Sequence, residues 1–394
     1  MKKKKLLAVV GLGMGDCGKG ITVDYLCSQN PNSLVIRYSG GPQAGHTVCY
    51  KDIRHVFASF GSGSLRGIPT YLSQHCVIDP IAIMYEYAVL KEKGISPTLY
   101  IDERCPIITP YDSFHTATDD QFKKNGTCGV GIGATYKREQ NLYSLTFHDI
   151  FYPEVLKIKL EQINKYYYGH KETFYIEPDL GVFLESCKKL VGNITEVSFA
   201  KKCYGIPEIP KCDTYIFEGS QGLLLDQNIG FFPHVTWGNT GSKNIVELCG
   251  TEDIEFYLVT RAYQTRHGNG PMTNEDITHD IQINPDETNR NHPHQGVFRR
   301  SLLDLNLIHY GISKDSVICH AKKKTLVITC LDHIKNSKVL FEDTYRFVAA
   351  DSVCRSYNEN EFIGKISKIL DIPDVLASSS DESKNMKKLH FKGD

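Results

Sequence analysis

The chain has no long hydrophobic run and no excess of charge of one sign. None of its apolar stretches approaches the roughly 20 residues that a membrane-spanning helix needs. The lysines at residues 2–5 precede a short apolar run that Gly11 and Asp16 interrupt, which is unlike a secretion signal. The 45 basic and 46 acidic residues leave a net charge of −1. The sequence therefore gives no reason to expect membrane insertion or binding of nucleic acid through a basic surface.

Closely spaced cysteines are also missing. The 13 cysteines form no C-x-x-C pair, and an odd number cannot all pair within one chain. Without a secretion signal, we expect reduced thiols and a cytoplasmic protein. Cys17, Cys128 and Cys330 are therefore interpreted as small packing residues and not as nucleophiles.

One residue is absent from an otherwise familiar phosphate-binding loop. Residues 13–20 read G-M-G-D-C-G-K-G and match G-x-x-x-x-G-K, but Gly20 stands where a magnesium-binding Ser or Thr is expected. An apolar run over residues 6–10 precedes the loop, and residues 21–26 can continue as a helix. Backbone N–H groups and the helix dipole favour phosphate in this context. We expect a nucleotide site in which Asp16 compensates for the missing hydroxyl.

Short apolar runs alternate with helical patterns along the chain, which predicts an α/β fold around a single, mostly parallel central sheet. No repeat or linker divides the sequence, so we expect one large domain over residues 1–394, with helical insertions between about residues 150 and 210. The strands are expected at residues 33–37, 99–101, 214–217, 256–260 and 325–329, and the clearest helices at 80–94, 154–168 and 179–191.

Three further segments place polar side chains directly after predicted strands. Residues 40–47 read G-G-P-Q-A-G-H-T, so His46 ends a second glycine-rich loop, where it could act as a general acid or an electrostatic catalyst. Residues 217–226 read F-E-G-S-Q-G-L-L-L-D and place Gln221 in a turn of small residues. Asp332 follows the strand at 325–329, where a carboxylate can accept hydrogen bonds from guanine N1 and N2.

Taken together and in this order, these segments resemble the adenylosuccinate synthetases. The family motifs G-D-E-G-K-G-K, G-G-x-N-A-G-H-T, F-E-G-A-Q-G-x-L-L-D, P-Y-V-T and T-R-x-G-x-G-P match residues 15–21, 40–47, 217–226, 233–236 and 265–271. The resemblance spans nearly the whole chain. It implies a homodimeric ligase that joins L-aspartate to a 6-oxopurine nucleotide, with GTP as energy donor and Mg²⁺ as cofactor.

The resemblance also implies a role for each matching residue. Asp16 would remove the proton from purine N1, so that O6 attacks the γ-phosphate of the donor nucleotide. His46 would stabilise the transferring phosphoryl group, and Lys19 and Gln221 complete the catalytic set. The amine of aspartate then displaces phosphate from C6. Mg²⁺ would bind phosphate oxygens, Asp16 and the backbone oxygen of Gly45, so that the chemistry depends mainly on positioning and charge stabilisation.

Further residues are implied as ligand contacts. The donor nucleotide would contact Gly15, Cys17, Gly18, Gly20, Gly45, Thr47, Arg299, Cys330 and Asp332. The acceptor nucleotide would contact Asp16, Gln43, Cys128, Arg138, Gln221, Leu225 and Thr236. The substrate aspartate would contact Gln295, Gly296, Val297 and Arg299.

The chain departs from the family pattern in its ligand loops. The family's aspartate loop reads T-T-G-R-x-R-R-x-G-W-L-D, whereas residues 294–304 read H-Q-G-V-F-R-R-S-L-L-D, with Val297 at the first arginine. Arg299 is retained, and we expect it to bind the carboxylate because a guanidinium can donate two parallel hydrogen bonds. The guanine motif T-K-x-D keeps Asp332 but has lost its lysine, so ATP remains an alternative to GTP.

Several functions stay open at this point. The altered loops also resemble a phage branch of the family, which joins aspartate to dGMP and makes a 2-aminoadenylosuccinate nucleotide. Asp16 favours IMP or dIMP instead, because the smaller residue of that branch makes room for the purine 2-amino group. A GTPase or kinase would need Ser or Thr at position 20 and a D-x-x-G element. A non-catalytic purine-binding paralogue is disfavoured because Asp16, Lys19, His46 and Gln221 are all retained.

Overall fold

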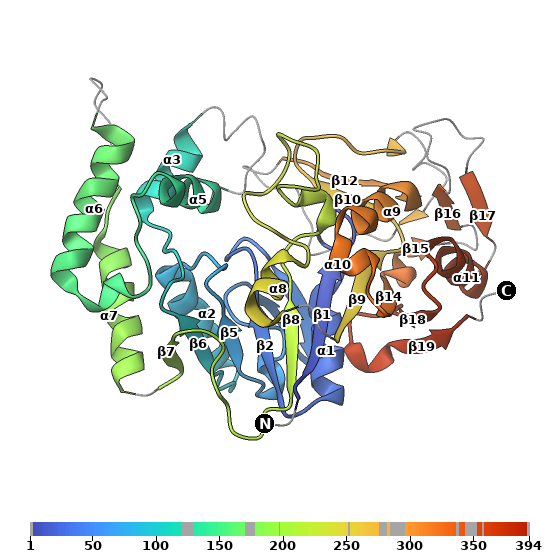
Figure 1. Ribbon diagram of the computed structural model, residues 1–394, viewed down its shortest axis with the longest axis horizontal. Helices are drawn as coiled ribbons and strands as arrows, with labels where there is room; N and C mark the ends of the chain where they lie inside the picture. Colours follow the sequence, from blue (N-terminus) through green and yellow to red (C-terminus); the bar gives the residue numbers. More distant parts are fainter. Residues whose placement is uncertain are drawn as a thin grey trace.

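The computed structural model describes residues 3–119, 129–169, 178–196, 198–250, 253–275, 282–283, 296–335, 339–342, 353–356 and 358–391. A ten-stranded sheet lies at its centre, in the order β19-β18-β14-β9-β1-β8-β2-β5-β6-β7 (Figure 1). All neighbouring strands are parallel except β18 and β19. The predicted α/β class is confirmed. The strands are β1 (Lys5–Gly11), β2 (Ser33–Arg37), β5 (Thr70–Leu72), β6 (Leu99–Asp102), β7 (Ala200–Cys203), β8 (Thr214–Glu218), β9 (Ile254–Arg261), β14 (Lys323–Thr329), β18 (Asp374–Ala377) and β19 (Lys387–His390).

The central strands are apolar on both faces because side chains from both sides of the sheet are buried against helices and loops. Residues 7–11 of β1 are all buried, and so is the whole of β2. The helices are α1 (Lys19–Gln29), α2 (Pro80–Glu92), α3 (Pro110–Thr118), α5 (Ile132–Gln140), α6 (Pro153–Tyr168), α7 (Gly181–Thr195), α8 (Lys243–Cys249), α9 (Leu305–Lys314), α10 (Ser316–Cys319) and α11 (Glu359–Leu370).

The three helices predicted most clearly are all present, with ends that differ by a few residues. Helix α2 begins where the sequence predicts it, because Asp79 accepts a hydrogen bond from the backbone N–H of Ile81 (2.8 Å) and Pro80 occupies the first turn. Helices α6 and α7 lie together beyond the β7 edge of the sheet (Figure 1). The predicted insertion between residues 150 and 210 is thus helical in α6 and α7. It also supplies the edge strand β7, which the sequence reading missed.

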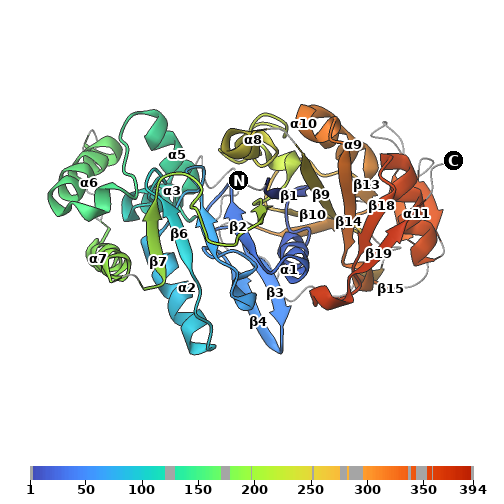
Figure 2. The same cartoon turned by 60° about the horizontal axis from the view of Figure 1, so that its bottom comes forward.

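Short strands outside the central sheet carry several of the predicted site residues. The hairpin of β3 (His46–Tyr50) and β4 (Ile53–Phe57) lies beside α1 (Figure 2). Strand β10 (Gln264–His267) pairs with β12 (Phe298–Ser301) in an antiparallel ribbon. The remaining short elements are β11 (Gln282–Ile283), β13 (Leu303–Asp304), β15 (Ile334–Lys335), β16 (Val339–Glu342), β17 (Val353–Ser356) and the 3₁₀ turns η1 (Ser64–Arg66), η2 (Asp149–Phe151), η3 (Leu223–Leu225), η5 (Leu331–His333) and η7 (Ser383–Asn385).

The topology gathers the sequence motifs at one edge of the sheet. Parallel strands have their carboxyl ends on the same side, and the motif loops follow β1, β2, β8 and β14. Ligands bind at this edge in open α/β sheets. The fold therefore brings together loops that lie as many as 312 residues apart in the sequence, as the approach of Thr329 Oγ1 to the backbone oxygen of Cys17 shows directly (2.9 Å).

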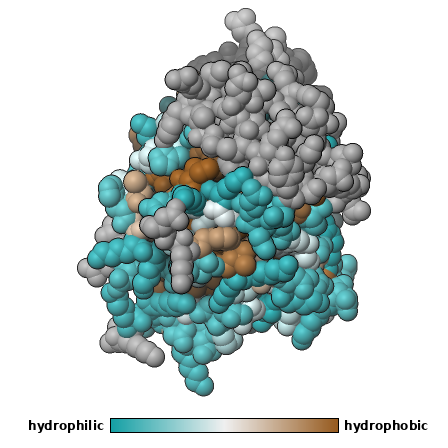
Figure 3. All heavy atoms as spheres, turned by 90° about the vertical axis from the view of Figure 1, so that its right-hand side faces the viewer, coloured by the Kyte–Doolittle hydropathy of each residue, from teal (hydrophilic) through white to brown (hydrophobic). Residues whose placement is uncertain are grey.

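Among the described residues, no helix is both long and apolar enough to cross a bilayer. Figure 3 shows the side of the molecule near its C-terminal elements, where the described surface is mainly hydrophilic around a small group of apolar atoms.

Candidate active site

The phosphate loop connects β1 to α1 through three residues with positive φ, namely Gly15 (95°), Asp16 (48°) and Gly18 (87°). Gly18 precedes the first turn of α1 and supplies no side-chain cap. A Cβ atom there would lie 2.7 Å from Cγ2 of Thr329, so a side chain is excluded. The backbone N–H groups at the start of α1 are consequently left for a ligand, as in other anion sites at helix N-termini.

The glycine at position 20 has a packing explanation. A Cβ atom on Gly20 would lie 3.0 Å from Cβ of His46 and 3.1 Å from the backbone oxygen of Thr47. Strand β3 therefore lies directly against the first turn of α1, in the space that a Ser or Thr side chain would need. The absence of a side chain at position 20 thus leaves the space in which His46 approaches the phosphate loop.

His46 is held by a buried carboxylate that sequence reasoning did not select. Its Nδ1 lies 2.7 Å from Oε1 of Glu218, the last residue of β8, and both side chains are buried. The same carboxylate accepts hydrogen bonds from the backbone N–H (3.1 Å) and the hydroxyl of Ser62. The opposite ring nitrogen, Nε2, is buried and has no hydrogen-bond partner among the described residues. The only sequence signal for Glu218 was its place between a buried strand and a glycine turn.

The electrostatics of this pair define its charge state. Burial raises the pKa of Glu218, but the charge and hydrogen bond of His46, the charge of Arg37 and the Ser62 hydroxyl lower it to about 2. Burial lowers the pKa of His46, and the charges of Arg37 and Lys19 lower it too, against the opposing effect of Glu218. At neutral pH the ligand-free site thus holds an ionised Glu218 beside a neutral imidazole whose Nδ1–H donates to it.

Lys19 lies beneath the loop after β8. Its buried Nζ donates to the backbone oxygen of Gln221 and lies 3.7 Å from Sγ of Cys17. Gln221 itself has a positive φ of 52°. The side-chain oxygens of Gln221 and Gln43 are both buried with no hydrogen-bond partner among the described residues. Since buried polar atoms in native proteins are normally paired, these two amides and His46 indicate a site for a polar ligand.

Asp16 stands at the tip of the phosphate loop and is partly exposed. Its Oδ2 lies 3.1 Å from Nε2 of His267, and its backbone oxygen accepts a hydrogen bond from Nε of Arg261. Burial raises the pKa of the Asp16 carboxyl, but the hydrogen bond and charge of His267, with the charges of Arg261 and Lys19, lower it below its ordinary value. The carboxylate is therefore ionised at neutral pH. His267 was not among the predicted site residues.

The residues predicted to bind the purine of the donor lie at the end of β14. Thr329 Oγ1 donates to the backbone oxygen of Cys17 (2.9 Å), which joins this strand to the phosphate loop. Cys330 has a φ of 58°, and the backbone N–H of Leu331 donates to the oxygen of Ser378 (3.2 Å). The Asp332 side chain is 42% exposed. The Asp332 carboxylate is thus partly open to solvent, and its Oδ2 lies 3.9 Å from Nε2 of His333.

Arg299 is engaged by its own chain. It lies on β12 and donates to the backbone oxygens of Gly268 (2.8 Å) and Gly270 (2.7 Å), while Glu275 lies 3.1 Å from its Nη1. The neighbouring Arg266 is buried and donates to three backbone oxygens; burial and the charge of Arg299 lower its pKa to about 10. Of the other residues predicted to bind aspartate, Gly296 and Val297 are exposed, and Gln295 lies outside the described residues.

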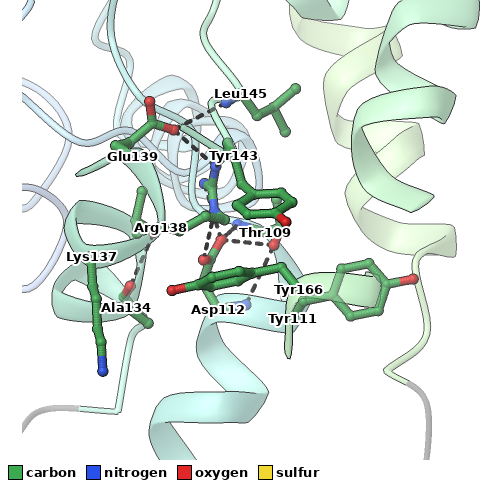
Figure 4. A network of polar contacts seen from close by, with 12 residues as sticks. Thr109, Tyr111, Asp112, Ala134, Lys137, Arg138, Glu139, Tyr143, Leu145 and Tyr166 are labelled. Carbon is green, nitrogen blue, oxygen red and sulfur yellow. Dashed lines mark hydrogen bonds and ion pairs between the residues drawn. The ribbon is translucent and has the colours of Figure 1, made fainter. Parts of the chain in front are cut away.

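The structure places Arg138 in a buried ion-pair network, which Figure 4 shows, and not at an open phosphate site. Its Nε lies 2.9 Å from Oδ1 of Asp112, and its other nitrogens donate to Oε1 of Glu139 (2.8 Å) and the backbone oxygen of Ile107 (2.8 Å). Asp112 also caps α3 through a capping box with Thr109. The prediction that Arg138 binds the acceptor phosphate is corrected accordingly, because Arg138 is buried and its guanidinium already donates to Asp112, Glu139 and the backbone oxygen of Ile107.

The remaining predicted contacts lie on two loops. Leu225 and Thr236 face each other across the segment after β8, where the backbone N–H of Thr236 donates to the oxygen of Leu225 (2.8 Å). The buried Asp226 closes this segment by accepting from the backbone N–H of Thr240 (2.6 Å). Gly45 precedes β3, which contains Thr47. Cys128 lies outside the described residues.

Fold and site together define an α/β protein with a modified phosphate loop. A model of the adenylosuccinate synthetase family matches residues 8–347, and the chain belongs to that family. The adenylosuccinate synthetase of Colwellia psychrerythraea is 32% identical over 289 residues, which cover 69% of this chain and 65% of that protein. The enzyme of Wigglesworthia glossinidia brevipalpis is 34% identical with the same coverage. The matched part thus spans about two thirds of these relatives' length.

Two solved structures share the fold. Fully ligated adenylosuccinate synthetase from Plasmodium falciparum superposes with a TM-score of 0.72 at 17% identity, covering 97% of this chain and 99% of that one. The succinoaminodeoxyadenylate synthetase of cyanophage S-2L, bound to dGMP and to dATP as an energy donor, gives a TM-score of 0.63 at 13% identity, covering 100% and 97%. At these identities the likeness concerns the fold.

The packing at Gly20 predicts that Gly20→Ala destabilises the protein by about 1–3 kcal/mol, because a methyl group would overlap the His46–Thr47 backbone. Gly192→Ala, inside α7 with open space around it, is the control and should stabilise by about 0.5–1 kcal/mol. Urea unfolding followed by circular dichroism measures both. Equal effects of the two substitutions would contradict the packing argument.

The network in Figure 4 predicts that Asp112→Ala lowers the free energy of unfolding by about 3–5 kcal/mol, because Arg138 would be left buried without its carboxylate. Glu185→Ala, which breaks the exposed Glu185–Lys189 pair of α7, should change stability little. Thermal and urea unfolding test both variants. A loss in Asp112→Ala no larger than that in Glu185→Ala would show that Arg138 is not held as described.

The His46–Glu218 pair predicts a change of titration in Glu218→Gln. An ionised carboxylate favours the imidazolium, so its removal should move the pKa of His46 further below its ordinary value. Ser62→Ala, which removes one hydrogen bond but keeps the charge of Glu218, should have a smaller effect on His46. NMR titration of the histidine ring protons in the ligand-free protein measures the change, and an unchanged or raised pKa in Glu218→Gln would refute the pairing.

Proposed function

We propose that this chain is a ligase that joins L-aspartate to C6 of IMP or dIMP, with hydrolysis of a nucleoside triphosphate, to give adenylosuccinate or its deoxy form, a nucleoside diphosphate and phosphate. Membership of the adenylosuccinate synthetase family supports the reaction class. The observation that carries the proposal is the convergence of Asp16, Lys19 and the His46–Glu218 pair on one phosphate loop. We further propose that the enzyme acts as a cytoplasmic homodimer.

The first step would activate the purine oxygen. Asp16, which is ionised, accepts the N1 proton, and O6 then attacks the γ-phosphorus. The new O6–P bond forms as the bond to the β–γ bridging oxygen breaks, leaving the diphosphate. In the second step the amine of aspartate adds at C6, the phosphate leaves with the O6 atom, and the amine loses a proton. Conversion of O6 into a phosphate ester supplies the leaving group that an amide-like oxygen lacks.

His46 would act electrostatically on the transferring phosphoryl group. Its Nδ1–H donates to Glu218, so Nε2 can donate to a phosphate oxygen only when the ring is protonated. Phosphates would offset the charges of Lys19 and Arg37, which lower the pKa of the free ring. The imidazolium would then lie between Glu218 and the phosphoryl oxygens, aligned before the reaction begins.

The oxygen donors near the loop fit Mg²⁺. The described residues contain no cluster of three or more His, Cys, Asp or Glu side chains, which disfavours a metal bound by protein alone. Mg²⁺ is commonly bound by one or two carboxylates together with substrate phosphates. Asp16 and the backbone oxygen of Gly45 would hold it, and the bound ion would neutralise charge on the phosphate oxygens.

The proposed acceptor and donor nucleotides are inferred from two sets of polar groups in the site. Gln43 and Gln221, whose buried oxygens have no partner among the described residues, would bind the acceptor together with Leu225 and Thr236. GTP is the proposed donor because Asp332 stands at the end of β14, where it can accept from guanine. The lost lysine beside it makes ATP the alternative.

A second acceptor class is supported by one finding. The cyanophage S-2L enzyme that shares the fold is bound to dGMP, so conversion of dGMP to a 2-aminoadenylosuccinate nucleotide is the alternative function. Asp16 weighs against it, because its carboxylate would stand beside the purine where the 2-amino group projects. A purine-binding protein without activity is the remaining alternative, and the ionised Asp16 and the buried His46–Glu218 pair disfavour it.

The test is a direct assay of the native protein with GTP or ATP, Mg²⁺ and aspartate against IMP, dIMP, GMP and dGMP, with products identified by mass. We expect product with IMP or dIMP, and loss of turnover in Asp16→Asn with nucleotide binding retained, because an amide cannot accept the N1 proton. No product with any acceptor would refute the ligase. Product only with dGMP would establish the alternative, and near-native turnover in Asp16→Asn would refute the role of Asp16.

A further inference from the structure

We infer that His267 is a positioning residue for Asp16 and thereby favours hypoxanthine over guanine in the acceptor. The inference rests on the proposed function, since it concerns the same reaction. His267 lies at the variable position of the T-R-x-G-x-G-P motif, so the motif itself assigns it no role. Its Nε2 lies 3.1 Å from Oδ2 of Asp16.

Asp16 is held from two directions by different elements. Its backbone oxygen accepts from Arg261 at the end of β9, and its side chain contacts His267 at the end of β10. Asp16 itself has a positive φ of 48°, which is uncommon outside glycine. It lies in the loop between β1 and α1, so neither element holds its side chain. The imidazole is thus a fixed point for an otherwise unsupported carboxylate.

The imidazole is in turn fixed by its own strand pair. His267 and Phe298 face each other in the register of β10 and β12, and their rings lie 4.7 Å apart between centroids at 40°. The next pair in the same register is Arg266 with Arg299, and Arg299 is the residue proposed for the substrate aspartate. One two-stranded ribbon therefore links the residue that activates the purine to the residue that would bind the amino acid.

The contact also limits what Asp16 can accept from a base. A carboxylate with both oxygens available could accept from N1–H and from the 2-amino group of guanine at once. With Oδ2 engaged by His267, Oδ1 is left for N1–H and for the Mg²⁺ that Asp16 would also hold, so neither oxygen is left for a 2-amino group. Hypoxanthine offers only N1–H on that edge. The Asp16–His267 pair therefore has hydrogen-bond acceptors for a 6-oxopurine that carries no 2-amino group.

The test compares His267→Val with His267→Gln, in which an amide N–H can still donate to Asp16. In His267→Val we expect kcat with IMP to fall by about 10–100-fold, with the IMP KM nearly unchanged, as is usual when a partner of a site carboxylate is removed. The preference for IMP over GMP, as a ratio of kcat/KM, should fall by about tenfold. His267→Gln should retain most of the kcat with IMP and most of the preference for IMP over GMP. The matched control is His390→Val, which breaks an exposed His–Asp pair of similar length (2.8 Å).

An activity-independent readout separates this inference from the proposed function. Crystal structures of the three proteins should show the Asp16 carboxylate displaced in His267→Val and retained in His267→Gln. An unmoved carboxylate in His267→Val, or a kcat within twofold of the native value, would overturn the positioning role. Equal losses of kcat and of melting temperature in His267→Val and His267→Gln would also overturn it, because they would show that His267 has only a structural role. Absence of product from the native protein would instead refute the proposed function, and the crystal structures would still decide the positioning role.

Discussion

The close approach of β3 to the first turn of α1 is the constraint on which the site depends. It leaves little room for a side chain at position 20, since a Cβ atom there would lie 3.0 Å from that of His46. It removes the hydroxyl that other phosphate loops use for magnesium, and it brings an imidazole to the helix N-terminus in exchange. Glu218, at the end of the adjacent β8, can then reach the same ring. The same backbone contact thus accounts for the missing hydroxyl at position 20 and for the presence of His46 beside the loop.

Much of this arrangement could be predicted because its signals are local. A strand, a glycine loop and a helix follow one another within residues 5–29, and each motif loop directly follows a strand. Parallel pairing then brings the loops to one edge without further information. For the same reason α2, α6 and α7 were located from their sequence patterns alone, whereas the edge strand β7, whose sequence A-K-K-C lacks an apolar run, was not.

The partners within the site could not be predicted, because they depend on contacts between distant segments. Glu218 lies 172 residues from His46, and His267 reaches Asp16 from a separate two-stranded ribbon. Arg138 shows that a predicted ligand contact can be wrong for the same reason. Its charge and its place near a ligand loop suggested a phosphate contact, but Asp112 neutralises it in the interior. A side chain's type limits its chemistry, but the fold decides which of its atoms are still available to a ligand.

Availability also describes the positively charged side chains around the phosphate loop. Lys19 donates to the backbone of Gln221, Arg261 to that of Asp16, and Arg299 to two glycine oxygens beside Glu275. These neutral and acidic acceptors satisfy the cations within the chain. A triphosphate has more negative charge than a backbone oxygen, whereas the carboxylate of the proposed substrate aspartate has the same charge as that of Glu275. We therefore expect charge to contribute more to binding of the proposed triphosphate than to binding of the proposed amino acid.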